Sequence, residues 1–265
     1  MKPYYGMFKM TFKGEIQYRA KAFSGVLTQF FWGVMFVYLY TAFMGGNIID
    51  GFSIPQMASY VWLGQAFFAM RFLDISKDTA REIQNGDVCY KFTRPINLYN
   101  QWFAENWGHK LSATILRSPL ILIIALLLPS NIGLMLPVSF SAFVLSVIAL
   151  IIGSIMMSAI SMIAVALIFK TASPKGVVSL VQTISGLLGG LYIPLPLMPE
   201  SVQNVINFLP FRYVTDLPTR IYIGNVGIMS GLMYIGIAVL WLVGLILIGQ
   251  LLIKMASKNA IIQGG

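Results

Sequence analysis

The sequence predicts an all-α polytopic membrane protein, and three observations support this fold class. First, 57% of the 265 residues are apolar and only 10% are charged, whereas a soluble domain carries about 25% charged residues. Second, the apolar residues gather into six stretches near the length of about 20 residues that a helix needs to cross a bilayer. Third, the lysines and arginines are distributed unevenly between the loops that join these stretches. We therefore expect one transmembrane domain, residues 1–265, with six transmembrane helices.

The residue counts exclude several other classes of protein. The chain has one cysteine, Cys89, and one histidine, His109. A single cysteine cannot form a disulfide within the chain, and two such residues cannot build a Cys/His zinc site. We expect neither residue to be catalytic. The net charge of +9 could indicate nucleic-acid binding, but in so apolar a chain we attribute it to membrane topology and expect no nucleic-acid partner.

The first element, residues 1–21, is predicted to be an interfacial helix. Its aromatic and aliphatic residues share one helical face, and lysines lie beside that face. This pattern is typical of a helix that lies among lipid headgroups, where lysines meet anionic lipid. The alternative is an ordinary basic segment before the first span. Residues 1–21 contain no apolar core with a small-residue cleavage site, so we expect no removable signal peptide.

The six spans fix a topology because the basic residues are distributed unevenly between the loops. We place the spans at about 22–44, 56–73, 111–129, 139–169, 176–193 and 228–253. With six spans, all but two of the 18 lysines and arginines lie on one side, and Arg212 and Arg220 lie on the other. The positive-inside rule then predicts that both termini are cytoplasmic.

The longest cytoplasmic segment, residues 74–110, is predicted to begin with a short helix. Thr79 and Glu82 have the spacing of a capping box. Asn85–Gly86 is a typical C-terminal stop. The alternative is a solvated loop that only links two spans.

A second helix is predicted in the same segment after Pro95, because a proline disfavours helical backbone at the preceding residue, Arg94. The aromatic residues that follow share one helical face, which suits a membrane interface. These residues are Tyr99, Trp102, Phe103 and Trp107.

The outer segment, residues 194–224, is too apolar for a solvated loop and is interrupted by five prolines. We expect two short re-entrant helices that dip into the outer leaflet and return. Arg212, Asp216 and Arg220 are four residues apart and can pair along one helical face. Such pairing is expected because charges at this depth need partners or water.

The chain lacks the motifs that would supply energy or catalysis. It contains no G-x-x-x-x-G-K-[ST] loop, no G-x-S-x-G and no H-E-x-x-H. The glycines of SGLLGG at 185–190 lack the lysine of a phosphate-binding loop, and we expect them to form a close-packing surface. Arg117 lies near the start of the third span, close enough to extend back to the cytoplasm. If the chain drives uphill transport, the energy must come from a partner.

These features together resemble the type-2 ATP-binding-cassette (ABC) permeases, the membrane subunits of many bacterial exporters. The resemblance covers nearly the whole chain and includes two motifs. The cytoplasmic motif corresponds to Glu82, Ile83, Gly86, Arg94 and Pro95. The outer motif corresponds to Leu209, Pro210, Phe211, Pro218 and Gly224.

The resemblance implies an assembly in the bacterial cytoplasmic membrane. Two permease chains, identical or related, would pair around a pathway, and two separate ATPase subunits would bind ATP and Mg²⁺ below. This chain would bind no cofactor or metal and would not be an enzyme by itself. The expected cargo is hydrophobic or amphipathic: a drug, a peptide, a lipid or a lipid-linked glycan.

The resemblance also implies two sets of functional residues. The short cytoplasmic helix would be the coupling helix that contacts the ATPase, with charged contacts from Arg81, Glu82 and Asp87 and apolar contacts from Ile83 and Val88. Its segment also includes Gly86 and Arg94. The outer helices would shape the outer gate. The gate residues would be Pro194, Pro196, Leu209, Pro210, Phe211, Arg212, Asp216 and Arg220.

Three other functions remain open from the sequence. A secondary transporter driven by an ion gradient needs a buried titratable residue, and none is evident inside the fourth and sixth spans. An intramembrane enzyme needs a nucleophile with a base, or a metal site. A sensor or immunity protein could use the same fold without transport.

Overall fold

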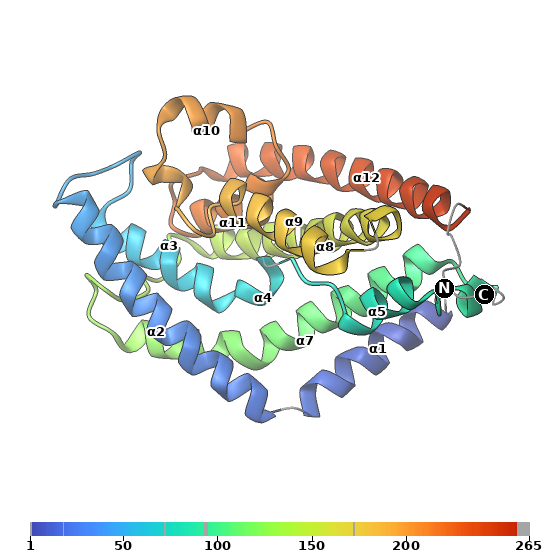
Figure 1. The fold of residues 1–265 in the computed structure, drawn as a ribbon. Helices are drawn as coiled ribbons and strands as arrows, with labels where there is room; N and C mark the ends of the chain where they lie inside the picture. Colours follow the sequence, from blue (N-terminus) through green and yellow to red (C-terminus); the bar gives the residue numbers. More distant parts are fainter. Residues whose placement is uncertain (1, 18, 72, 93–94, 172, 259–265) are drawn as a thin grey trace.

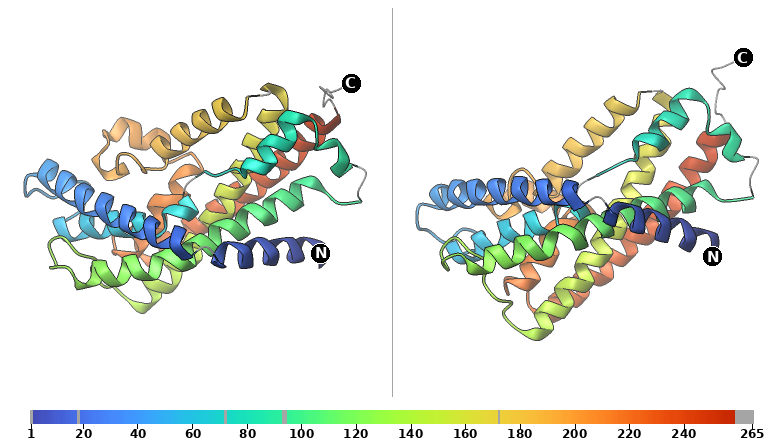
Figure 2. Two further views of the ribbon diagram at one scale, coloured as in Figure 1. Left: turned by 60° about the horizontal axis from the view of Figure 1, so that its bottom comes forward. Right: turned by 90° about the horizontal axis from the view of Figure 1, so that it is seen from below.

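The computed structural model describes residues 2–17, 19–71, 73–92, 95–171 and 173–258, and these form a bundle of helices (Figures 1 and 2). The predicted all-α class is confirmed for this part of the chain. In chain order the helices are α1 (Lys2–Gln17), α2 (Arg19–Met44), α3 (Ile54–Ala66), α4 (Phe68–Arg71), α5 (Lys77–Asn85), α6 (Cys89–Phe92), α7 (Leu98–Leu127), α8 (Phe140–Thr171), α9 (Pro174–Leu188), the 3₁₀ turn η1 (Leu195–Leu197), α10 (Glu200–Ile206), α11 (Phe211–Tyr222) and α12 (Ile228–Lys258).

Four of the described helices are long and apolar enough to cross a membrane. Their apolar portions are Ala22–Met44, Leu98–Leu127, Phe140–Thr171 and Ile228–Ser257, which have 23 to 32 residues. At 1.5 Å of rise per residue, each exceeds the roughly 30 Å of the hydrocarbon core. These four helices correspond to the first, third, fourth and sixth predicted spans.

The second and fifth predicted spans have a different form. Helix α3 ends at Ala66, and the short helix α4 resumes at Phe68. Helix α9 has 15 residues, or about 22 Å at the helical rise. It is followed by Gly189 and by Gly190, whose φ of 72° is left-handed. A count of six crossings therefore remains a prediction for these two segments.

Helix α8 lies at the centre of the core and packs against α7, α9, α11 and α12. Its contact with α11 depends on Gly153, because a Cβ at this position would lie 2.9 Å from Cα of Val214. Further along α8, Met156 and Val165 are fully buried. The predicted close packing of the 185–190 glycines is confirmed at Gly189, where a Cβ would lie 3.1 Å from the Thr215 hydroxyl oxygen.

Helix α1 is confirmed as a helix and lies along α7 (Figure 1). The rings of Phe8 and Trp107 pack with their centroids 5.3 Å apart. Gly108 lets the two helices approach, because a Cβ there would lie 3.0 Å from the Phe8 carbonyl oxygen. The Tyr4 hydroxyl accepts a hydrogen bond from the backbone N–H of Asn97 at 3.0 Å. The position of α1 among lipid headgroups stays a prediction.

Different helices and loops lie at the two ends of the bundle. The first turn of α1, the last turn of α12 and helix α5 lie toward one end, whereas α10 and the loop after α2 lie toward the other (Figures 1 and 2). This arrangement agrees with the predicted topology, in which both termini share a side with the 74–110 segment.

Candidate functional site

Helix α5 carries three of the predicted coupling residues, Arg81, Glu82 and Ile83, and its start differs from the prediction. The N-cap is Ser76, whose side chain accepts a hydrogen bond from the backbone N–H of Asp78 at 3.3 Å. The predicted capping box at Thr79 is wrong. Ser76 already caps the first turn, and Thr79 therefore lies inside the helix, where it is buried.

The predicted end of α5 is confirmed. Gly86 has a φ of 81°, and its N–H donates to the carbonyl of Ile83 at 3.3 Å. The N–H of Val88 donates to the carbonyl of Glu82 at 3.1 Å. Glycine adopts this left-handed conformation without the steric cost of a Cβ, which explains why it stands here. The helix is thus closed at both ends by its own sequence.

The predicted coupling residues divide between the surface and the core. Arg81 and Asp87 are exposed. Glu82 forms an ion pair with Lys91, with 2.6 Å between Oε2 and Nζ. Ile83 is half-buried against the main core, and Val88 is 2% exposed within it. In this structure Val88 therefore anchors the segment to its own chain. Arg94 lies outside the described residues.

One exposed aromatic residue near Asp87 was not among the predicted coupling residues. Tyr90, in α6, is 76% exposed. A tyrosine this exposed beside Asp87 extends the surface that a partner can contact. The sequence contains a signal that could have identified Tyr90, because it lies four residues after Gly86 of the cytoplasmic motif.

The loop before α5 is held by contacts from two other helices. His109 of α7 lies between two carboxylates, with Nε2 3.2 Å from Oδ2 of Asp74 and Nδ1 3.1 Å from Oε1 of Glu15 in α1. Asn106 donates a hydrogen bond to the backbone carbonyl of Asp74 at 2.6 Å. Partial burial alone would raise the pKa of Asp74, but the hydrogen bond with His109 and the charge of Lys110 outweigh it and hold that pKa below its usual value.

A polar cavity of about 710 Å³ lies beside these contacts, between α1, α5, α7 and α8. His109 and Asp74 line it together with the inner side of α5. His109 therefore has a positioning role that the sequence did not reveal, because its two carboxylate partners are distant along the chain.

Half of the aromatic face at the start of α7 is buried, because Tyr99 and Trp102 lie in the core while Phe103 and Trp107 are half-buried. Tyr99 and Trp102 are 3% and 2% exposed. The Trp102 ring packs against Phe169 of α8, with 6.1 Å between centroids. The predicted interfacial role is wrong for Tyr99 and Trp102, because the first turns of α7 pack into the core, and it stays a prediction for Phe103 and Trp107.

The predicted outer segment forms η1, α10 and α11, so two short α-helices are present as predicted, and their dip into the outer leaflet stays a prediction. Pro194 precedes η1, which contains the buried Pro196. Leu209 and Pro210 form the turn after α10, and α11 begins at Phe211. Pro218 lies inside α11 without ending it. The helix is buried against α8, and we attribute its persistence through Pro218 to this packing, which can override a local propensity.

The predicted charge pairing along α11 is confirmed. Asp216 is fully buried, and its Oδ2 lies 2.8 Å from Nε of Arg220 and 3.4 Å from Nε of Arg212. Two partners come from distant parts of the chain. Arg220 also pairs with Asp50, in the loop after α2, at 2.8 Å. The Tyr60 hydroxyl of α3 donates to Oδ1 of Asp216 at 3.2 Å. The sequence could not identify these two partners.

The four long apolar helices define the class of multi-pass helical membrane proteins. The family model described as "ABC-2 family transporter protein" matches residues 30–263. The chain therefore belongs to the ABC-2 transporter family, whose members are membrane subunits that work with ABC ATPase subunits. Comparisons with curated proteins and with solved structures found no match.

Proposed function

We propose that this chain is the membrane subunit of an ATP-driven exporter in the bacterial cytoplasmic membrane. Membership of the ABC-2 family supports its partnership with ABC ATPase subunits. The structural observation that carries the proposal is α5, a short helix closed at both ends, with Arg81 exposed on the helix and Asp87 exposed just after its C-cap. In this proposal the chain crosses the membrane six times, with both termini cytoplasmic, and it pairs with a second permease chain.

The proposed mechanism transmits motion from the ATPase subunits through α5. Those subunits bind ATP and Mg²⁺, and their closure displaces α5. Because Gly86 and Ser76 close the helix and Val88 seats its following turn in the core, α5 moves as a unit. Helix α5 contacts α8 and α9, so its displacement reaches the centre of the bundle.

The outer end responds through the contact between α8 and α11. Val214 packs directly on Gly153, and Asp216 joins α11 to α3 through the Tyr60 hydroxyl. A shift of α8 therefore acts on the outer segment, which we propose to be the outer gate. The cargo that leaves by this route is hydrophobic or amphipathic, since the long helices that form the bundle are apolar.

The test reverses two exposed charges, Arg81 on α5 and Asp87 just after it. We expect Arg81→Glu with Asp87→Lys to reduce co-purification of the ATPase by about tenfold, which is about 1.4 kcal/mol of binding free energy. Cargo-stimulated ATP hydrolysis should fall with it. Glu200→Lys, an exposed charge reversal on α10 at the other end of the bundle, is the matched control. Unchanged co-purification in a folded double variant would remove α5 from the proposed interface.

One buried carboxylate keeps the secondary transporter as an alternative. Asp216 is fully buried, and intramembrane carboxylates serve proton and ion coupling in carriers. Here Asp216 contacts two guanidinium groups and accepts a hydrogen bond from the Tyr60 hydroxyl, which favours a structural role in holding α11 over a role in ion coupling. Transport into vesicles that contain this chain, a proton gradient and no ATPase would support the alternative. A sensor or immunity protein would transport nothing in either assay.

A further inference from the structure

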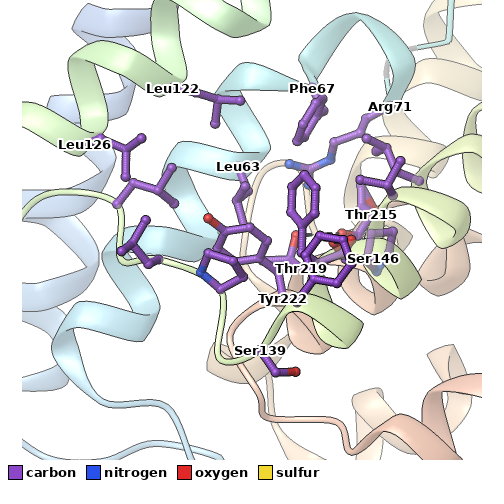
Figure 3. A pocket seen from close by; sticks show the side chains of 18 residues that line it. Leu63, Phe67, Arg71, Leu122, Leu126, Ser139, Ser146, Thr215, Thr219 and Tyr222 are labelled. Atoms are coloured by element: carbon purple, nitrogen blue, oxygen red, sulfur yellow. Dashed lines mark hydrogen bonds between the residues drawn. The ribbon is translucent and has the colours of Figure 1, made fainter.

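A second cavity, of about 600 Å³, lies between α3, α4, α7, α8 and α11 (Figure 3). Its volume is in the range of small-molecule sites, and its walls are largely apolar, with Leu63, Phe67 and Leu122 among the lining side chains. Two further lining residues, Leu136 and Phe140, are 71% and 81% exposed. The cavity is therefore continuous with the apolar surface that faces lipid in a membrane.

One charged side chain reaches into this apolar cavity. Arg71, at the end of α4, is 7% exposed and points its guanidinium toward the other lining residues (Figure 3). Its buried Nε makes no hydrogen bond, and none of the described carboxylates lies within 4 Å of it. A Cβ at Gly64 would overlap the guanidinium, so the absence of a side chain there makes room for Arg71.

The hydroxyl groups of the cavity are already used within the protein. They donate to backbone carbonyls or share a hydrogen bond with another serine. The donors and their partners are Thr215 to Gly189, Thr219 to Thr215, Ser146 to Phe143, Tyr222 to Met135, and Ser139 with Ser141. Among the lining side chains, all of which the structure describes, Arg71 is the donor that remains for a ligand.

The carboxylates of α11 and of the loop after α2 make their close ion pairs with other guanidinium groups. Asp216 pairs with Arg220 and Arg212, and Asp50 pairs with Arg220. Asp216 attracts the guanidinium of Arg71 only from beyond ion-pair distance, so Arg71 has no carboxylate in direct contact. A buried charge is costly unless a partner compensates it. An anionic group next to Arg71 would supply that partner.

We propose that this cavity binds an anionic amphiphile with a single acyl chain. The head, a carboxylate or a phosphate monoester, pairs with the planar guanidinium of Arg71, whose fork of donors suits both groups. The acyl chain fills the apolar space and extends toward Leu136 and Phe140. A cationic amphiphile is repelled by Arg71, and a neutral one leaves its charge uncompensated. As a statement about cargo, this inference rests on the proposed export function.

The binding experiment uses the purified full-length chain in neutral detergent without any ATPase. The probes are a diazirine-bearing palmitic acid, a lysophosphatidic acid with the same chain, and the corresponding alcohol. After photolysis, labelled peptides are identified by mass spectrometry. We expect the acid, the phosphate or both to label the peptides around residues 122–126 and 140–147. Labelling by the alcohol should be about tenfold weaker, in line with the strength of charge-assisted hydrogen bonds.

Variants separate the charge from the cavity. We expect Arg71→Gln to lower labelling by the anionic probe about tenfold, whereas Arg71→Lys retains part of it and Lys175→Gln, an exposed control on α9, retains all of it. Leu126→Trp fills the cavity at its rim without changing Arg71, so it keeps the test valid if Arg71→Gln does not fold. We expect it to block labelling.

The outcomes decide between ligand sources and between proposals. Labelling by the carboxylate alone indicates a fatty-acid ligand, and labelling by the phosphate alone indicates a lysophospholipid. Equal labelling by the acid and the alcohol overturns the inference, as does labelling that survives both Arg71→Gln and Leu126→Trp. Since no ATPase is present, such a failure leaves the proposed export function standing. Loss of that function is detected separately, by the α5 charge reversal.

Discussion

Replacing Arg220 by methionine tests whether the charge pairing on α11 holds the outer segment in place. The guanidinium contacts the fully buried Asp216 at 2.8 Å and Asp50 at 2.8 Å. The change removes the closer partner of a carboxylate that has no access to water. Arg212 remains 3.4 Å from Asp216, so the carboxylate keeps some compensation.

The magnitude follows from these contacts. Breaking a buried ion pair by removing one partner costs about 3–5 kcal/mol, and the residual contact with Arg212 places Arg220→Met near the lower end of that range. At about 2–4 °C per kcal/mol for a chain of this size, the expected fall in melting temperature is roughly 6–12 °C. The measurement is thermal unfolding of the purified chain in detergent.

Two further variants make this prediction refutable. Arg212→Met removes only the longer contact and should cost less than Arg220→Met. The double variant Asp216→Leu with Arg220→Met removes both charges, and it should be more stable than Arg220→Met alone because no carboxylate is left buried without its partner. The reasoning is wrong if Arg212→Met costs as much as Arg220→Met, or if the double variant is the least stable of the three.

Three other predictions concern separate contacts. The pKa of Asp74 is lower in the folded state, so its ionised form stabilises the fold above the unfolded pKa of about 4. This contribution is lost as the pH falls through the folded pKa. The difference in melting temperature between the wild type and Asp74→Asn should therefore shrink in acid. A constant difference would count against the His109 contact. Gly86→Ala should destabilise α5 by about 1 kcal/mol, because φ there is 81°, with local hydrogen exchange as the measurement. Gly33→Ala should cost about 1–3 kcal/mol by overpacking, since its Cβ would lie 2.6 Å from the Trp62 ring; an unchanged melting temperature would contradict this.

Local patterns in the sequence predicted much of the fold. Gly86 ends α5 because a left-handed residue was needed at that point, and glycine is a local signal. The spacing of Arg212, Asp216 and Arg220 predicted their pairing because residues four apart meet on any helix. Long apolar stretches predicted four helices that are long enough to cross a membrane. In each case the information lay within a few turns of the chain.

Features that depend on contacts between distant segments could not be predicted. Arg71 was counted among the loop cations that set the topology, yet its side chain is buried beside Gly64. The aromatic turn of α7 was assigned to the membrane interface because its pattern alone does not show that α8 covers it. His109 acquires its partners only when α1 folds back along α7. Burial and pairing of this kind arise from tertiary packing.

Helix α8 connects the two ends of the helix bundle. Contacts with α5 and with α11 fall on this one 32-residue helix, whose interior lacks proline, the commonest cause of a kink. An axial slide imposed at one extremity is therefore transmitted to the other along one uninterrupted helix, Phe140–Thr171. A substitution midway along α8 can consequently alter events on both faces of the membrane while it touches neither of them.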